Sequence, residues 1–130
     1  MATPIDPDFR AHLAALGDKY AAGVPALLDA IAQALARCRA EAPGADAAAA
    51  LHKALHAVAG SAGTFGFGAL GTQCRTLEHA LRLLMEQPTI DVGMAAAAWP
   101  ALAGQVDELL RRAAHDPKGL ALPGASALHV

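Results

Sequence analysis

Apolar residues recur every three or four positions along most of the chain, which is the spacing of helices with one buried face. The dipeptide Asp6-Pro7 is a typical helix start. It precedes a short apolar stripe made of Phe9, Leu13, Leu16 and Tyr20. The pair Val24-Pro25 is expected to end this helix and to begin a second one that reaches Arg39. The pattern therefore predicts a short N-terminal helix followed by a longer one.

Three more helical segments follow. The first is expected to have Asp46 as its N-cap and to reach the Gly-rich stretch at 63–68, and the second to run from Ala69 to Pro88. The last contains Trp99-Pro100, where we expect a kink or a break. We therefore predict an all-α fold, an antiparallel four-helix bundle with an additional short N-terminal helix. Residues 1–115 are expected to form the bundle, and residues 116–130, which lack periodicity, a flexible C-terminal tail or linker.

Composition agrees with helices and argues against several classes of partner. The chain has 130 residues, with 35 Ala and 18 Leu but only five Val and three Ile, a balance that disfavours β-sheets. The net charge is −2 and the ten basic residues are dispersed, so no basic face for nucleic acid is expected. No apolar run approaches the ~20 residues of a membrane span, and the N-terminus lacks the pattern of a secretory signal. Cys38 and Cys74 are expected to be reduced core residues, in a monomeric cytoplasmic protein without nucleic-acid or membrane partners.

A histidine and a glycine on the third helix are the first candidate functional residues. The buried stripe of this helix consists of Leu51, Leu55, Val58 and Ala62. At about 100° per residue, His56 lies at the edge of this stripe or exposed, and Gly60 points outward. A helical Gly costs roughly 1 kcal/mol relative to Ala, so the pair suggests that something bulky approaches the imidazole. The alternative is that Gly60 and Gly63 only loosen the helix before the turn.

The next helix carries Glu78 at the expected height of His56. If the two helices turn at Thr64-Phe-Gly-Phe-Gly68, then His56 and Glu78 each lie eleven residues from Phe67. A carboxylate at that height could accept the Nδ1 proton of His56 and leave Nε2 as the free nucleophile. The alternative is a solvated Glu78 that pairs with Arg75 or Arg82. Spacing alone does not fix the helix rotation that decides between them.

The same helix also raises the question of a metal or haem site. His52 and His56 are four residues apart, a spacing that can chelate a metal, and His79 lies on the neighbouring helix. No third and fourth ligand are evident from the spacing. No metal site is therefore predicted.

The segment ALHAVAGSAGTFGFGALGTQCRTLEHAL resembles the signature of histidine-containing phosphotransfer domains. In that signature a His is followed, after two residues, usually by a Lys, then by a Gly and a Ser or Ala, a Gly-containing turn, a Leu, a Cys and Leu-Glu. The resemblance implies that His56 is the phosphoacceptor and that Glu78 forms a hydrogen bond with its ring. Gly60 would be the small residue that admits the partner. The resemblance also implies a four-helix bundle with an extra short helix.

The resemblance further implies a place in a bacterial-type multistep phosphorelay. His56 would accept a phosphoryl group from the aspartyl phosphate of a response-regulator receiver domain and pass it to another receiver. The partners would be receiver domains, hybrid histidine kinases, or both, and the Mg²⁺ would be bound by the receiver. The chain would then be a phosphocarrier rather than an enzyme. Partner docking and the phosphoryl environment would involve Lys53, Ala59, Gly60, Ser61, Gly63 and Arg75.

Ala59 departs from the pattern of that family, which often has Lys three residues after the His. A Lys offers positive charge to the phosphoryl group, and Lys53 or Arg75 could supply this charge instead. The departure leaves a second hypothesis open. In it the chain is a degenerate, non-phosphorylated helical module that binds a partner or a metal through the same face.

Overall fold

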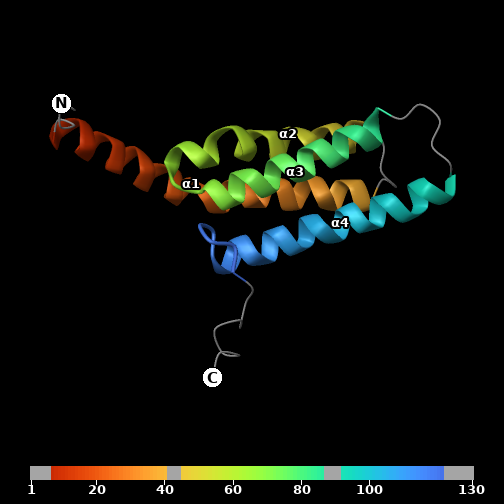
Figure 1. The fold of residues 1–130 in the computed structure, drawn as a ribbon. Helices are drawn as coiled ribbons and strands as arrows, with labels where there is room; N and C mark the ends of the chain where they lie inside the picture. The colour runs from red at the N-terminus through yellow and green to blue at the C-terminus, as the bar shows by residue number, and fades with distance from the viewer. Residues whose placement is uncertain (1–6, 41–44, 87–91, 122–130) are drawn as a thin grey trace, which may run out of the picture.

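The computed structural model describes residues 7–40, 45–86 and 92–121. It contains the helices α1 (Pro7–Ala40), α2 (Ala45–Ser61), α3 (Gly68–Met85) and α4 (Val92–His115), with a short 3-10 helix η1 (Ala62–Phe65) between α2 and α3. Successive helices run in opposite directions (Figure 1), and no described residue belongs to a strand. The predicted all-α bundle is confirmed. The predictions for Asp6, for the helix end at Pro88 and for residues 122–130 lie outside the described residues.

The prediction of an additional short N-terminal helix is wrong, because α1 continues through Pro25 as one helix. Pro25 has no N–H to bind the carbonyl of Ala21. Both residues are exposed, so water can reach that carbonyl, and the helix bends there without ending (Figure 1). In the same way α4 contains Pro100, which is exposed, without a break. Asp46 is the second residue of α2, inside its first turn, so it is not the N-cap that was predicted.

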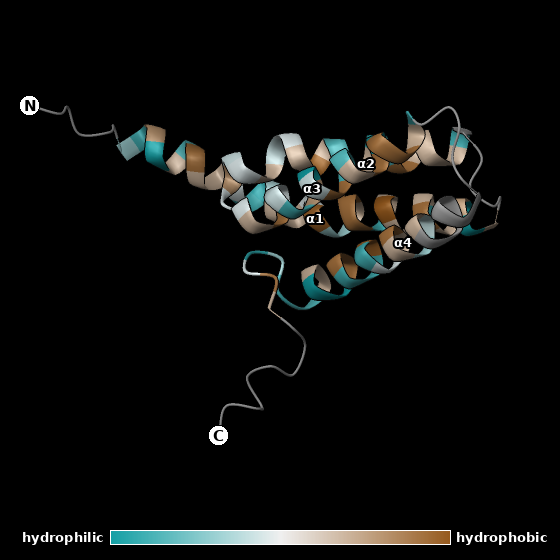
Figure 2. Ribbon diagram, turned by 45° about the vertical axis from the view of Figure 1, so that its right-hand side comes forward, coloured by the Kyte–Doolittle hydropathy of each residue, from teal (hydrophilic) through white to brown (hydrophobic). Residues whose placement is uncertain are grey.

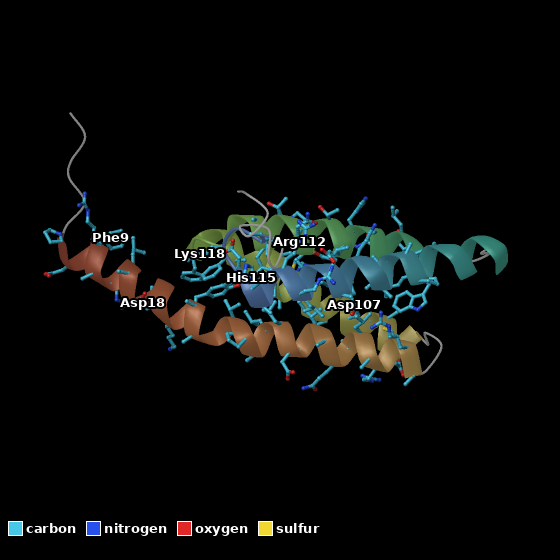
Figure 3. The ribbon with its side chains drawn as sticks, turned by 90° about the horizontal axis from the view of Figure 1, so that it is seen from below. Phe9, Asp18, Asp107, Arg112, His115 and Lys118 are labelled. Atoms are coloured by element: carbon cyan, nitrogen blue, oxygen red, sulfur yellow. The ribbon has the colours of Figure 1, made fainter. Side chains whose placement is uncertain are left out.

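The N-terminal turns of α1 extend beyond the other helices. Phe9 lies on this projecting end (Figure 3), and Phe9, Leu13 and Leu16 are all exposed. Of the predicted stripe, only Tyr20 packs against the bundle, with its ring 4.8 Å from that of Phe65. The part of α1 that packs against the rest of the bundle therefore includes Tyr20 and the residues after it.

By length and composition α1 could cross a membrane, since it contains an 18-residue window of mean hydropathy 1.2. This differs from the sequence expectation, in which no apolar run approaches that length. The core helix of a soluble bundle passes the same test, and 33% of this window is buried. The finding concerns length and composition alone.

Aliphatic side chains from all four helices fill the core. Figure 2 shows hydrophobic positions along α1 and α2 within the bundle and an alternation of hydrophobic and hydrophilic positions along α4. Cys38 and Cys74 are both buried in the core, as predicted. Burial, and then the nearby charge of Glu78, raises the pKa of the Cys74 thiol to about 12. The largest fully buried aliphatic side chains are Ile31, Leu35, Leu51, Leu55, Leu70, Leu81, Val58 and Val106.

Two glycines fix the hairpin formed by α2 and α3. Gly66 has a φ of 89°, a left-handed conformation that favours Gly, and it reverses the chain after η1. Gly71 allows the two helices to approach, because a Cβ there would lie 3.3 Å from Ala62 Cβ and 3.4 Å from the backbone nitrogen of Gly63. The two glycines thus set the register and the separation at which side chains of α2 and α3 meet.

Residues 116–121 pack onto the bundle, which differs from the flexible tail expected after residue 115. Asp116 accepts hydrogen bonds from the backbone N–H groups of Gly119 (3.0 Å) and Ala121 (3.3 Å), and these lower the pKa of its carboxyl group. Lys118 Nζ lies 5.4 Å from the centre of the Phe67 ring, and the side chain of Leu120 is buried. The packed structure therefore extends to Leu120.

Candidate functional site

Glu78 is the one charged residue that is buried in the described part of the chain. Its Oε1 atom lies 2.6 Å from His56 Nδ1, 3.3 Å from Arg82 Nη2 and 3.4 Å from His52 Nε2. A carboxylate out of water is unfavourable unless it is paired or hydrogen-bonded. These three neighbours therefore explain how α3 can hold Glu78 against α2.

His56 presents one edge of its ring to Glu78 and the rest to solvent. The His56 side chain is 69% exposed, whereas that of Glu78 is 8% exposed. With the proton on Nδ1, the ring donates it to the carboxylate and keeps a lone pair on Nε2. The site can therefore present a fixed, accessible nitrogen nucleophile to a large electrophile.

The hydrogen bond between His56 and Glu78 fits the equal height that the symmetry about Phe67 predicts, and the helix rotation, which spacing left open, brings the two side chains together. The alternative, a solvated Glu78, does not fit its burial. Arg82 does contact the carboxylate, as that alternative expected, but it shares Oε1 with the two histidines. Arg75 instead donates to the backbone carbonyl of Ala59, at 3.2 Å.

Gly60 leaves the surface of α2 open one turn after His56. It is exposed, and a Cβ built on it would meet no other atom within 4 Å. The same holds for Gly63 in η1. Because a helical Gly costs about 0.5–1 kcal/mol relative to Ala, packing inside the protein gives no reason for Gly at position 60.

Ala59 does not belong to the surface on which the sequence prediction placed it. It is 6% exposed, so its side chain is not available to a partner. It lies four residues after Leu55 and three before Ala62, and this spacing already places it on the buried stripe. The family position at which Lys is common is thus a core position in this chain.

Ser61 is half-buried and holds α1 against the end of α2. Its hydroxyl donates to the carbonyl of Ala57 at 2.8 Å, and it therefore accepts the proton of the Tyr20 hydroxyl, also at 2.8 Å. Both of its hydrogen bonds are internal. The structure therefore gives Ser61 a structural contact rather than a free hydroxyl.

Two cations lie on either side of the helix face that carries His56. Lys53 is exposed and lines a shallow groove of about 410 Å³ between α1 and α2. Arg75 is exposed on α3, and its hydrogen bond to the Ala59 carbonyl holds it across α2, one turn beyond His56. Positive charge is therefore present near His56 although residue 59 is not Lys.

The Hpt domain family model matches residues 16–115 of the chain. The chain belongs to the Hpt domain family. Hpt domains are helical phosphocarrier modules, not enzymes, and they act in histidine phosphotransfer within phosphorelays. Members typically interact with receiver domains and histidine kinases. No curated protein and no solved structure matches the chain at a significant level.

The described part of this Hpt domain contains no set of side chains that fits the alternative of a metal site. Residues 7–40, 45–86 and 92–121 contain no group of three or more His, Cys, Asp or Glu side chains arranged to hold a metal ion. His52 and His56 both face the same oxygen of Glu78, and their rings are nearly parallel, with 6.2 Å between centroids.

His52 is the residue of this site that sequence reasoning missed, since it considered His52 only as a metal ligand. The signal was its spacing: one turn before His56, it lies on the same flank of α2 and faces the same carboxylate. Whether this flank of α2 faces Glu78 depends on how the helix is rotated about its axis. The sequence does not determine that rotation, but the structure shows it.

Proposed function

We propose that this Hpt domain carries a phosphoryl group on Nε2 of His56. It accepts the group from the aspartyl phosphate of a receiver domain and passes it to a second receiver. The observation that carries the proposal is the 2.6 Å contact between His56 Nδ1 and the buried Glu78 carboxylate, beside a ring that is 69% exposed. This contact directs the nucleophilic nitrogen outward.

The accepting step uses the two ring nitrogens differently. The Nε2 lone pair attacks phosphorus and forms an N–P bond, while the P–O bond to the aspartyl group breaks and leaves a free carboxylate on the receiver. The Nδ1 proton stays on the ring, which gains positive charge. Glu78, already in place, stabilises that charge without having to reorganise. Transfer to the second receiver reverses each of these changes.

The surroundings of His56 fit the approach of a receiver carrying a charged group. Gly60 removes a side chain from the approach path, and Lys53 and Arg75 supply positive charge for the phosphoryl oxygens. Arg75 in particular takes the part that Lys plays in relatives with Lys at the position of Ala59. The receiver supplies the Mg²⁺ and the aspartate. We place this exchange in the cytoplasm, with receiver domains or a hybrid histidine kinase as partners.

The test is label transfer from a phosphorylated receiver domain to the full chain. We expect label that is acid-labile and base-stable, and we expect it to be lost in His56→Gln with the fold unchanged, because His56 lies outside the core. His79→Gln removes an exposed imidazole next to Glu78 and is the matched control, which should keep the label. Absence of label on the wild-type chain, or label that persists in His56→Gln, would overturn the proposal. Receiver binding without label would favour the non-phosphorylated module.

A further inference from the structure

His52 carries an unexplained polar atom next to the proposed site. Within residues 7–40, 45–86 and 92–121, its Nε2 is the only buried side-chain nitrogen or oxygen without a hydrogen bond. It lies 3.4 Å from Glu78 Oε1, close enough for an electrostatic contact but without the alignment of a hydrogen bond. Because an unsatisfied buried donor or acceptor is unfavourable, a half-buried imidazole at this position calls for a reason.

Besides His56, two side chains lie close to Glu78 Oε1. Arg82 reaches it along α3, from a side chain that is about half exposed and on the same helix as Glu78. His52 reaches it from α2, the helix that also carries His56, and its side chain is only 24% exposed. Arg82 alone would draw the carboxylate along its own helix. Besides His56 itself, His52 is the neighbour on α2 that lies against the carboxylate.

We propose that His52 is a positioning residue, whose Nε2–H holds the Glu78 carboxylate in the orientation that binds His56 Nδ1. The inference rests on the proposed function, since it concerns the same imidazole. Hydrogen bonds at reaction sites are often long or poorly aligned in the free protein and tighten as charge develops. A small rotation of the His52 ring aligns its N–H with Oε1 at the point where His56 becomes positively charged. His52 itself does not contact the phosphoryl group.

Two variants of similar size separate the hydrogen bond from packing. His52→Gln keeps an N–H donor close to the place of Nε2, and His52→Met fills a comparable volume without one. The first measurement is the tautomer of the His56 ring in the free full-length chain, by ¹⁵N chemical shifts. The second is the rate at which phosphoramidate, a small phosphodonor that needs no receiver, labels His56.

We expect His52→Gln to keep both the Nδ1–H tautomer of His56 and the labelling rate within about twofold. His52→Met should raise the fraction of the other tautomer and slow labelling about fivefold, the factor expected for the loss of one hydrogen bond. His79→Met, which removes an exposed imidazole of α3, should change neither measurement. Urea unfolding of each variant shows whether the chain is folded when it is measured.

Each outcome decides the proposal. If His52→Met keeps the wild-type tautomer and rate, or if Gln and Met change both equally, then His52 acts only through packing and the proposal is wrong. If the tautomer shifts as expected but not even the wild-type chain is labelled, positioning by His52 is supported and the phosphoacceptor role of His56 fails. The two claims are therefore distinguishable.

Discussion

Replacing Gly60 by Ala should make the protein more stable and a poorer phosphotransfer partner. The added Cβ meets no atom within 4 Å, and Gly60 lies in α2 without a positive φ, so the only internal effect is the helix preference of Ala over Gly. That preference amounts to about 0.5–1 kcal/mol. For a domain of this size it corresponds to a rise in Tm of about 2–8 °C.

In the proposed function, the same methyl group lies on the face that a receiver approaches. A methyl group forced into a well-packed contact costs on the order of 1–3 kcal/mol, so transfer from a phosphorylated receiver should slow about tenfold or more. Labelling by phosphoramidate, which needs no docked receiver, should stay near the wild-type rate. The added methyl group should therefore hinder docking of the receiver without changing the reactivity of His56.

Gly104→Ala is the matched control for this prediction. Gly104 is exposed inside α4, and a Cβ there also meets nothing within 4 Å. It should give the same gain in Tm, measured by circular dichroism, and leave transfer unchanged. A loss of stability in Gly60→Ala would refute the reasoning about open space. Unchanged transfer and unchanged receiver affinity would show that Gly60 is only a helix-end feature.

Three further predictions concern the bundle. Gly71→Ala should destabilise the protein by about 1 kcal/mol in urea unfolding, because its Cβ would meet Ala62 Cβ at 3.3 Å, and any gain would contradict the close approach of α2 and α3. The folded Cys74 thiol keeps its proton up to about pH 12 and the unfolded thiol only to about 9, so stability should fall as pH rises through this window. Cys74→Ala should lose that decline, and an equal slope in both proteins would count against it. Arg39 donates two hydrogen bonds to the exposed Asp107, which lowers the pKa of this carboxyl group, so Asp107→Asn should cost less than about 1 kcal/mol at neutral pH. The difference from wild type should vanish as pH falls through the lowered pKa, and a difference that persists in acid would contradict the pairing.

Periodicity was sufficient for the bundle but not for the behaviour of its prolines. The stripe of Leu51, Leu55 and Val58 is buried as spacing predicts, since a helix in a bundle has one apolar face. The break expected at Pro25 did not occur, and Pro25 and Ala21, the residue four positions before it, are both exposed. Whether a proline ends a helix or only bends it depends on that exposure, which sequence spacing does not determine.

For the candidate site, the sequence predicted which residues lie at the same level of the two helices, but not how the helices are rotated about their axes. Equal distances from Phe67 brought His56 and Glu78 level, because the hairpin turns tightly at Gly66. The contact of His52 with Glu78 depends on how α2 is rotated against α3. That rotation results from side-chain packing between the helices, which sequence spacing does not describe. For Ala59, helical spacing indicates the core position that the structure shows. The prediction followed the family pattern instead and placed this residue on the surface.

The measurement that tests the central claim most directly is the identity of the phosphorylated atom. The full chain, labelled with ¹⁵N in its histidines and phosphorylated by a receiver, can be examined by ³¹P–¹⁵N NMR. We predict a single phosphoryl group on Nε2 of His56, with the proton retained on Nδ1 against Glu78. A phosphoryl group on Nδ1, on another histidine, or on no histidine at all would contradict the account.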